Sequence, residues 1–74
     1  MHIYADFNNR DADGCLRLNN AGTVNDLAEK SIVLTEGTRL VVSDGDLMAE
    51  IVVRSPCREG VWRGEIIGAP TEMK

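Results

Sequence analysis

The sequence predicts a mainly β domain, a small antiparallel barrel of five to six strands with one short helix. Short apolar runs alternate with clusters of turn-forming residues, which is typical of small barrels and sandwiches. The longest apolar runs, such as Leu40–Val42, have three residues, far from the roughly 18 of a membrane-spanning helix. Several short strands in 74 residues cannot stay flat, so we expect them to curl into an SH3-like or OB-like barrel. The sequence does not distinguish these two architectures.

Length and composition limit the chain to one small domain. With 74 residues and a 43% hydrophobic share, it has enough apolar side chains for one core but not for two. We expect a single barrel domain over residues 1–69 and a flexible C-terminal tail over residues 70–74. The N-terminus lacks the basic start and apolar run of a signal peptide, which favours a cytoplasmic protein. In that compartment Cys15 and Cys57 are expected to be free thiols rather than a disulfide.

The N-terminal part of the chain predicts a β-hairpin. One strand is expected at His2–Phe7 and the next at Cys15–Leu18, on either side of the polar segment Asn8–Gly14. Centring the hairpin on Arg10 and Asp11 places the alternate apolar residues of both strands on one face. We therefore expect these two strands to be neighbours in an antiparallel sheet.

One helix is predicted over Val24–Lys30. Thr23 can act as its N-cap, and Asp26 lies three residues later, as in a capping box. Val24 and Leu27 fall on one face of such a helix and predict the side that packs inward. Because two helical turns are not stable alone in water, we expect this helix to close one end of the core.

The remaining strands are predicted at Ile32–Leu34, Thr38–Ser43, Asp46–Arg54 and Val61–Ile67. The dipeptide Asp44-Gly45 between two β-rich runs is the strongest hairpin signal in the chain. A hairpin centred there pairs Val42 with Leu47 and keeps apolar residues on one face.

The last hairpin is predicted around Cys57 and Arg58, which pairs Val53 with Trp62. All three hairpin registers separate apolar from polar side chains in the same way, so they predict one common core. The predicted core consists of Ile3, Ala5, Phe7, Leu16, Leu18, Val24, Leu27, Ile32, Leu34, Leu40, Val42, Leu47, Ala49, Ile51, Val53, Trp62 and Ile66.

The same registers leave apolar side chains on the outer face of the sheet. Val41, Met48 and Ile67 are predicted to fall in one row across three strands, and Val52 lies two positions along the same face. A contiguous row of exposed apolar side chains is informative, whereas isolated ones are ordinary. In the first hairpin Tyr4 faces Arg17 on the outer side and adds a second contact point. The predicted interaction surface therefore consists of Val41, Met48, Val52, Ile67, Tyr4 and Arg17.

The segment Asn9–Gly14 resembles the start of an EF-hand calcium loop, with oxygen ligands at Asn9, Asp11 and Asp13 followed by glycine. It departs from that pattern because Asn20 stands where the loop needs a bidentate glutamate. Its flanks are also predicted strands rather than helices. We therefore expect a polar turn in preference to a calcium site, and an ion- or ligand-binding module at this loop is the first alternative function.

No residue arrangement predicts an enzyme. The only histidine, His2, lies next to the N-terminus, and Cys15 and Cys57 lack the C-x-x-C spacing of zinc sites. Glycine-rich phosphate loops are absent from the sequence. The carboxylates fall on turns and on the outward face, where solvation keeps them ionised. We expect no cofactor and no catalytic residues.

The charge balance narrows the classes of partner. Eight basic and twelve acidic residues give a net charge of −4, which argues against nucleic acid and against an anionic membrane surface. A nucleic-acid-binding barrel is the second alternative, and it would need a basic patch made by Arg39, Arg54 and Arg63. The sequence favours a non-enzymatic module that binds a protein partner or a second copy of itself.

Overall fold

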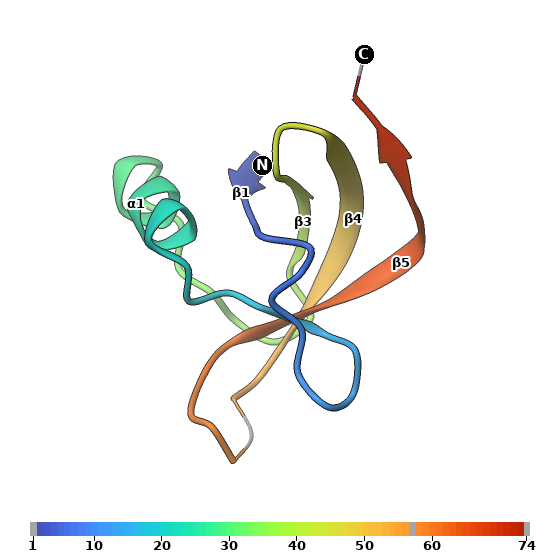
Figure 1. Cartoon of the computed structure of the whole chain (residues 1–74). Helices are drawn as coiled ribbons and strands as arrows, with labels where there is room; N and C mark the ends of the chain where they lie inside the picture. Colours follow the sequence, from blue (N-terminus) through green and yellow to red (C-terminus); the bar gives the residue numbers. More distant parts are fainter. Residues whose placement is uncertain (1, 57, 74) are drawn as a thin grey trace.

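The computed structural model describes residues 2–56 and 58–73. One five-stranded sheet curls into a half-barrel, and one helix lies beside one of its edges (Figure 1). The elements are β1 (His2–Tyr4), β2 (Leu16–Arg17), α1 (Ala21–Glu29), β3 (Arg39–Ser43), β4 (Leu47–Arg54) and β5 (Arg63–Glu72). The prediction of a mainly β fold with one short helix is confirmed. In the described part of the chain, no helix is long and apolar enough to cross a membrane.

The strand order in the sheet is β1-β3-β4-β5-β2. β1 runs parallel to β3, and the other neighbouring strands are antiparallel. The predicted N-terminal hairpin is therefore wrong, and so is the expectation of a purely antiparallel sheet. Ile3 pairs with Val42 of β3, and Leu16 pairs with Gly64 of β5, at the opposite edge. Apolar alternation fixed which face of each strand is buried, but any strand with the same alternation can be its neighbour.

The two predicted hairpins on either side of β4 are present, but each is centred one residue later than predicted. Val42 pairs with Ala49, and Val53 pairs with Gly64. A shift of one residue in the turn moves the pairing by two residues, so every side chain keeps its predicted face. Cys57, one of the two residues on which the second hairpin was centred, lies outside the described residues.

The turn between β3 and β4 shows why its centre differs from the prediction. One carboxylate oxygen of Asp44 accepts hydrogen bonds from the N–H groups of Asp46 and Leu47, each at 2.8 Å. Asp44 therefore opens the turn, and Gly45 follows with a φ of 101°, which favours glycine. These two hydrogen bonds hold the pKa of Asp44 below its usual range.

The inner face of the half-barrel carries the core. Its buried apolar residues are Ile3, Ala5, Phe7, Cys15, Leu16, Leu18, Leu40, Val42, Ala49, Ile51 and Val53. Leu27, Ile32, Leu34, Leu47, Trp62 and Ile66 are partly buried and pack against them. Among the predicted core residues Val24 is wrong, because 51% of its surface is exposed. Residues 32–34, predicted as a strand, form none.

The helix starts earlier than predicted and is turned differently. It begins at Ala21 with Asn20 as its N-cap residue, whereas Thr23 is fully buried within its first turn. The Thr23 hydroxyl donates to the Tyr4 carbonyl at 2.7 Å. Thr23 therefore docks the helix on β1 instead of capping it, and Val24 points to solvent as a consequence.

The helix also covers the free edge of β1. The N–H of Tyr4 donates to the Asp26 carboxylate at 2.7 Å, and the Lys30 ammonium donates to the His2 carbonyl. Together with Thr23, these side chains repeat at i, i+3 and i+7, which brings them to one side of a helix. Backbone groups that would otherwise lie open at a sheet edge are thus satisfied by α1.

The C-terminal strand continues beyond its predicted end at Ile67. β5 pairs with β4 as far as Glu72, which lies opposite Leu47, so residues 70–72 are not the unpaired tail that the sequence predicted. Gly68 and Pro70 both weaken a regular strand. Here they fall where the β4–β5 pairing shifts its register, between Met48 and Glu50 on β4, and a bulge accommodates such residues.

Candidate interaction surface

The outer face of the sheet carries the candidate site. Since successive residues of a strand point to opposite faces, the strand pairing arranges the outer side chains in rows. One row holds His2, Val41, Glu50 and Ile67, and the next holds Tyr4, Ser43, Met48 and Thr71. Towards the other end of the sheet follow a row of Arg39, Val52 and Glu65 and a row of Arg54, Arg63 and Arg17.

Glu50 stands among four apolar side chains. Val41 and Ile67 are its neighbours across the strands, and Met48 and Val52 are its neighbours along β4 on the same face. Ile67 is 37% exposed, and the other three are half-buried. We call Glu50, these four residues and the nearby Tyr4 the Glu50 surface.

The structure brings together all the residues of the predicted interaction surface except Arg17. Their arrangement differs from the prediction, because Glu50 stands between Val41 and Ile67, where Met48 was expected. The two-residue difference in pairing explains this exchange. The apolar row is thus an apolar ring around one carboxylate.

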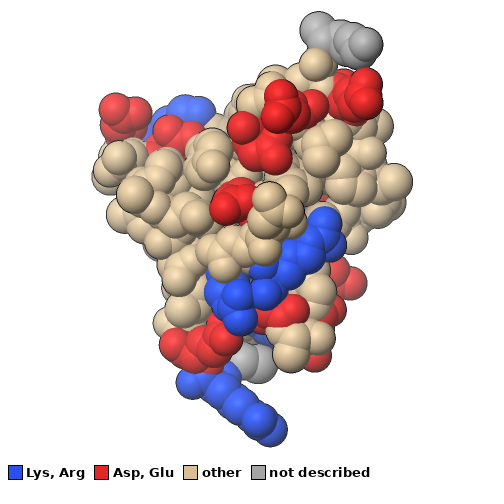
Figure 2. Space-filling view, viewed as in Figure 1, with Lys and Arg blue, Asp and Glu red and all other residues tan. Residues whose placement is uncertain are grey.

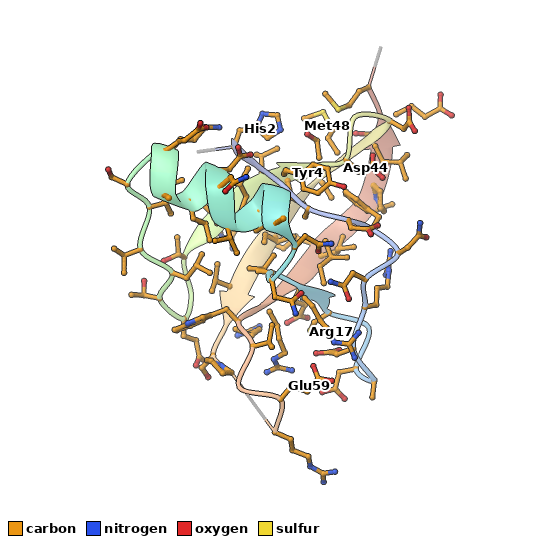
Figure 3. All side chains as sticks on the ribbon, turned by 60° about the vertical axis from the view of Figure 1, so that its left-hand side comes forward. His2, Tyr4, Arg17, Asp44, Met48 and Glu59 are labelled. Atoms are coloured by element: carbon orange, nitrogen blue, oxygen red, sulfur yellow. The ribbon has the colours of Figure 1, made fainter. Side chains whose placement is uncertain are left out.

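Tyr4 and Arg17 lie at opposite edges of the sheet, so their predicted contact is wrong. In Figure 3, Tyr4 lies near His2 and Met48 at one end, whereas Arg17 lies beside Glu59 at the other. The Tyr4 ring packs on Gly22 of α1, where a Cβ atom would come within 2.8 Å of a ring carbon. This contact holds a 36% exposed tyrosine at the border of the Glu50 surface.

The opposite end of the outer face holds three arginines side by side, which we call the arginine row: Arg54, Arg63 and Arg17. Each guanidinium is engaged by a carboxylate. Arg54 contacts Glu65 at 2.7 Å, and Arg17 donates two hydrogen bonds to Glu59 at 2.8 and 2.9 Å. The hydrogen bond from Arg17 holds the pKa of Glu59 below its usual range, although some desolvation opposes this effect.

Arg63 is the most buried member of the arginine row, with 15% of its side chain exposed. It lies 3.5 Å from Asp11 and 3.4 Å from Asp13 of the Asn9–Gly14 loop. Desolvation raises the pKa of Asp11, but hydrogen bonds from the N–H groups of Cys15 and Asp13, together with Arg63, outweigh it and lower this pKa. The loop is thus tied to β5 through one guanidinium.

This arrangement bears on the calcium hypothesis for Asn9, Asp11 and Asp13. Both aspartates already face the cationic group of Arg63. The Asn9 side-chain amide donates to the side-chain oxygens of Asn19 and Asn20, each at 2.9 Å. Among the described residues, no group of three His, Cys, Asp or Glu side chains is arranged to hold a metal ion. The hydrogen bonds and ion pairs fit the polar turn that the sequence favoured.

Cys15 lies beside this loop and is buried. Burial and the nearby Asp11 raise the pKa of its thiol, which disfavours the reactive thiolate. An open, mainly polar cavity of about 480 Å³ is lined by Cys15, Arg54 and Arg63 among other residues. Arg54 and Arg63 are engaged by carboxylates, and Arg10, which also lines the cavity, donates its Nε–H to the Phe7 carbonyl at 3.0 Å. Cys57, which the sequence analysis predicted to be a free thiol, lies outside the described residues.

Basic and acidic side chains are interspersed on the molecular surface, as Figure 2 shows for one face. A nucleic-acid-binding barrel would need a basic patch made by Arg39, Arg54 and Arg63. Each of these arginines has a carboxylate partner, which offsets its charge. Sequence reasoning missed the arginine row for two reasons. Arg17 was paired with β1 instead of β5, and the predicted pairing of Val53 with Trp62 did not bring Arg54 opposite Arg63, as the observed pairing does.

Comparison of the chain with protein-family models, with curated proteins and with solved structures finds no match. Function is therefore inferred from the surface itself. The arginine row has close ion pairs, whereas the carboxylate of the Glu50 surface has a longer one.

Proposed function

We propose that this chain is a non-enzymatic protein-interaction module that binds a protein partner through the Glu50 surface. The observation that supports this proposal is the ring of four adjacent, partly exposed apolar side chains on one face of the sheet. Contiguous exposed apolar side chains on a small protein mark binding surfaces more often than scattered ones do. Met48 and Tyr4 are residue types that suit such contacts, because methionine adapts its shape and tyrosine combines an apolar ring with a hydroxyl.

The two edges of the sheet offer less to a partner than the outer face does. The β1 edge is covered by Thr23, Asp26 and Lys30 of the helical segment. At the other edge the short β2 pairs with β5 only at Arg63 and Gly64. The part of β5 beyond β2 is interrupted by a register shift and carries Pro70, which has no N–H to donate. Both features disfavour the addition of a further strand, so the face rather than an edge is the proposed docking site.

The architecture agrees with this role. We propose that the half-barrel is a variant of the small SH3-like or OB-like barrels, which serve as scaffolds for binding rather than for one fixed chemistry. The cytoplasmic location and the barrel type are both part of the proposal.

Site-specific photocrosslinking in cells tests the proposal. A photoreactive benzoylphenylalanine is placed at Ile67 in the Glu50 surface and, as a matched control, at Val33. Val33 is an apolar residue with 80% exposure that lies outside this surface. Expression and thermal melting of both variants show first that each one folds.

We expect position 67 to give a discrete protein adduct after irradiation, and position 33 to give none. An adduct with another protein or with a second copy of this chain supports an interaction module. Equal yields at both positions, or no adduct at either, would overturn the assignment of the Glu50 surface.

A further inference from the structure

We infer that the partner places a lysine or arginine side chain, flanked by apolar side chains, on the Glu50 surface. This inference rests on the proposed function and adds the chemistry of the partner. It starts from Glu50, the one carboxylate that stands inside the apolar ring.

Glu50 is held only loosely in the free protein. Within residues 2–56 and 58–73 its one ion pair, with Arg39, has an N–O distance of 3.8 Å, and the Glu50 and Arg39 side chains are 46% and 65% exposed. By contrast, the carboxylates of Glu59 and Glu65 lie 2.7–2.9 Å from their arginines. The Glu50 carboxylate therefore retains most of its capacity to accept hydrogen bonds from an incoming group.

Covering the apolar ring would also take Glu50 out of water. A buried carboxylate without a cationic or hydrogen-bonding partner is strongly destabilising. A partner that covers Val41, Met48, Val52 and Ile67 must therefore bring a donor to the centre of the ring. A lysine or arginine supplies that donor together with the opposite charge, and its aliphatic stem can pack on the apolar ring.

The charge of this chain favours a basic partner over a second copy. Its net charge is −4, and this field attracts basic proteins and repels an identical chain. A two-fold contact centred on the ring would bring two Glu50 carboxylates together, which is unfavourable for like charges. We accordingly expect the free protein to be a monomer.

Selection from a phage-displayed library of random nine-residue peptides tests this inference. The immobilised full chain is the bait, and the enriched peptides are synthesised and titrated against purified protein. The variants are Glu50→Gln, which removes the charge and keeps the shape, and Ile67→Asp, which disrupts the apolar ring. Glu36→Gln, an exposed carboxylate in the turn before β3, is the matched control.

We expect the enriched peptides to share a lysine or arginine flanked by apolar residues. Their affinity should fall about tenfold for Glu50→Gln, the scale of one charge-assisted contact, and should stay unchanged for Glu36→Gln. Selection against Glu50→Lys should enrich an acidic residue in place of the basic one.

The possible failures are distinguishable. Peptides that lose affinity for Ile67→Asp but not for Glu50→Gln would overturn the basic partner and leave the proposed function standing. Peptides that bind all variants equally, or a library that yields no binder, would overturn both. Light scattering that shows a dimer disrupted by Ile67→Asp would replace the basic partner with a second copy of this chain.

Discussion

The arginine row and the Glu50 surface lie on the same face of the same sheet, yet their charged side chains differ in how closely they are paired. In the arginine row every guanidinium has a carboxylate within 2.7–3.5 Å, supplied by β5 or by the two loops that flank β2 and β5. On the Glu50 surface one carboxylate stands among apolar side chains with a single contact at 3.8 Å. The first region satisfies its charges within the chain, whereas the second leaves a charge available.

This difference separates the residues that stabilise the fold from those available for binding. Arg63 connects β5 to the Asn9–Gly14 loop through a partly buried ion pair, so its removal affects folding. The four apolar side chains around Glu50 are only partly buried, so we expect their substitution to affect binding more than folding. The predictions below test this separation, starting from the largest effect on stability.

The largest effect is expected from Arg63→Met, compared with Arg39→Met on the same face. The first change leaves the Asp11 carboxylate, 9% exposed, without its cationic neighbour, and we expect a loss of about 2 kcal/mol in the free energy of unfolding. Arg39 is 65% exposed, and its replacement should cost about 0.5 kcal/mol or less. Urea denaturation measures both changes, and equal losses would contradict the difference drawn between the two regions.

Acid should weaken the protein through the carboxylates that are paired or hydrogen-bonded. The pKa values of Glu59, Asp44 and Asp11 are lowered in the folded state, so their contribution is present above the unfolded-state pKa of about 4. It is lost as the pH falls through the folded-state values. The melting temperature should therefore stay level between about pH 7 and pH 5 and decline below about pH 4.

The variant Glu59→Gln sharpens this pH test. It removes one carboxylate whose pKa the Arg17 hydrogen bonds lower, so its melting temperature should depend less on pH below about pH 4 than that of the unmodified protein. Glu36→Gln, outside the arginine row, is the control. Identical pH profiles for all three proteins would show that the Arg17–Glu59 pair does not stabilise the fold.

A smaller effect on stability is expected from Ile67→Thr in the Glu50 surface. The substitution keeps a β-branched side chain on β5 and replaces a residue that is 37% exposed. We expect a change of about 0.5 kcal/mol or less in the free energy of unfolding, together with weaker binding of the selected peptides. A large loss of stability would show that Ile67 contributes to folding and would weaken its assignment to a binding surface.

The smallest effect is expected from calcium. Because Asp11 and Asp13 face Arg63 and the Asn9 amide is hydrogen-bonded to its neighbours, millimolar calcium should leave the melting temperature unchanged, and so should a chelator. A calcium-dependent rise that disappears in Asp13→Asn would show that the loop binds the ion in competition with Arg63.

The sequence predicted which face of each strand is buried, since this depends only on the alternation of apolar residues. Apart from Val24, every predicted core residue is buried or packs against the core. Alternation also placed Val41, Met48, Val52 and Ile67 on one outer face. Predictions that depend on a local pattern of period two were therefore reliable here.

Predictions that depend on the identity of a neighbouring strand were not. The pairing of β1 with β3 joins residues 39 positions apart, and that of β2 with β5 joins residues 46 and 48 positions apart. No local pattern distinguishes such a partner from the nearer one. The exposure of Val24 has a similar cause. Thr23 fits a helix cap by its sequence, but its hydroxyl bonds to Tyr4 on another element. The position of Glu50 between Val41 and Ile67 depended on the two turns beside β4, since each of them shifted the pairing by two residues.

In the proposed function, partners bind at the Glu50 surface and not at the arginine row. Mapping backbone amide chemical shifts by NMR, while a selected peptide is added to the ¹⁵N-labelled protein, tests it most directly. We predict that the largest shifts fall on Val41, Met48, Glu50, Val52 and Ile67, and that Arg17, Arg54 and Arg63 stay unshifted. Shifts centred on the arginine row or along the β5 edge, with those five residues unaffected, would contradict the account.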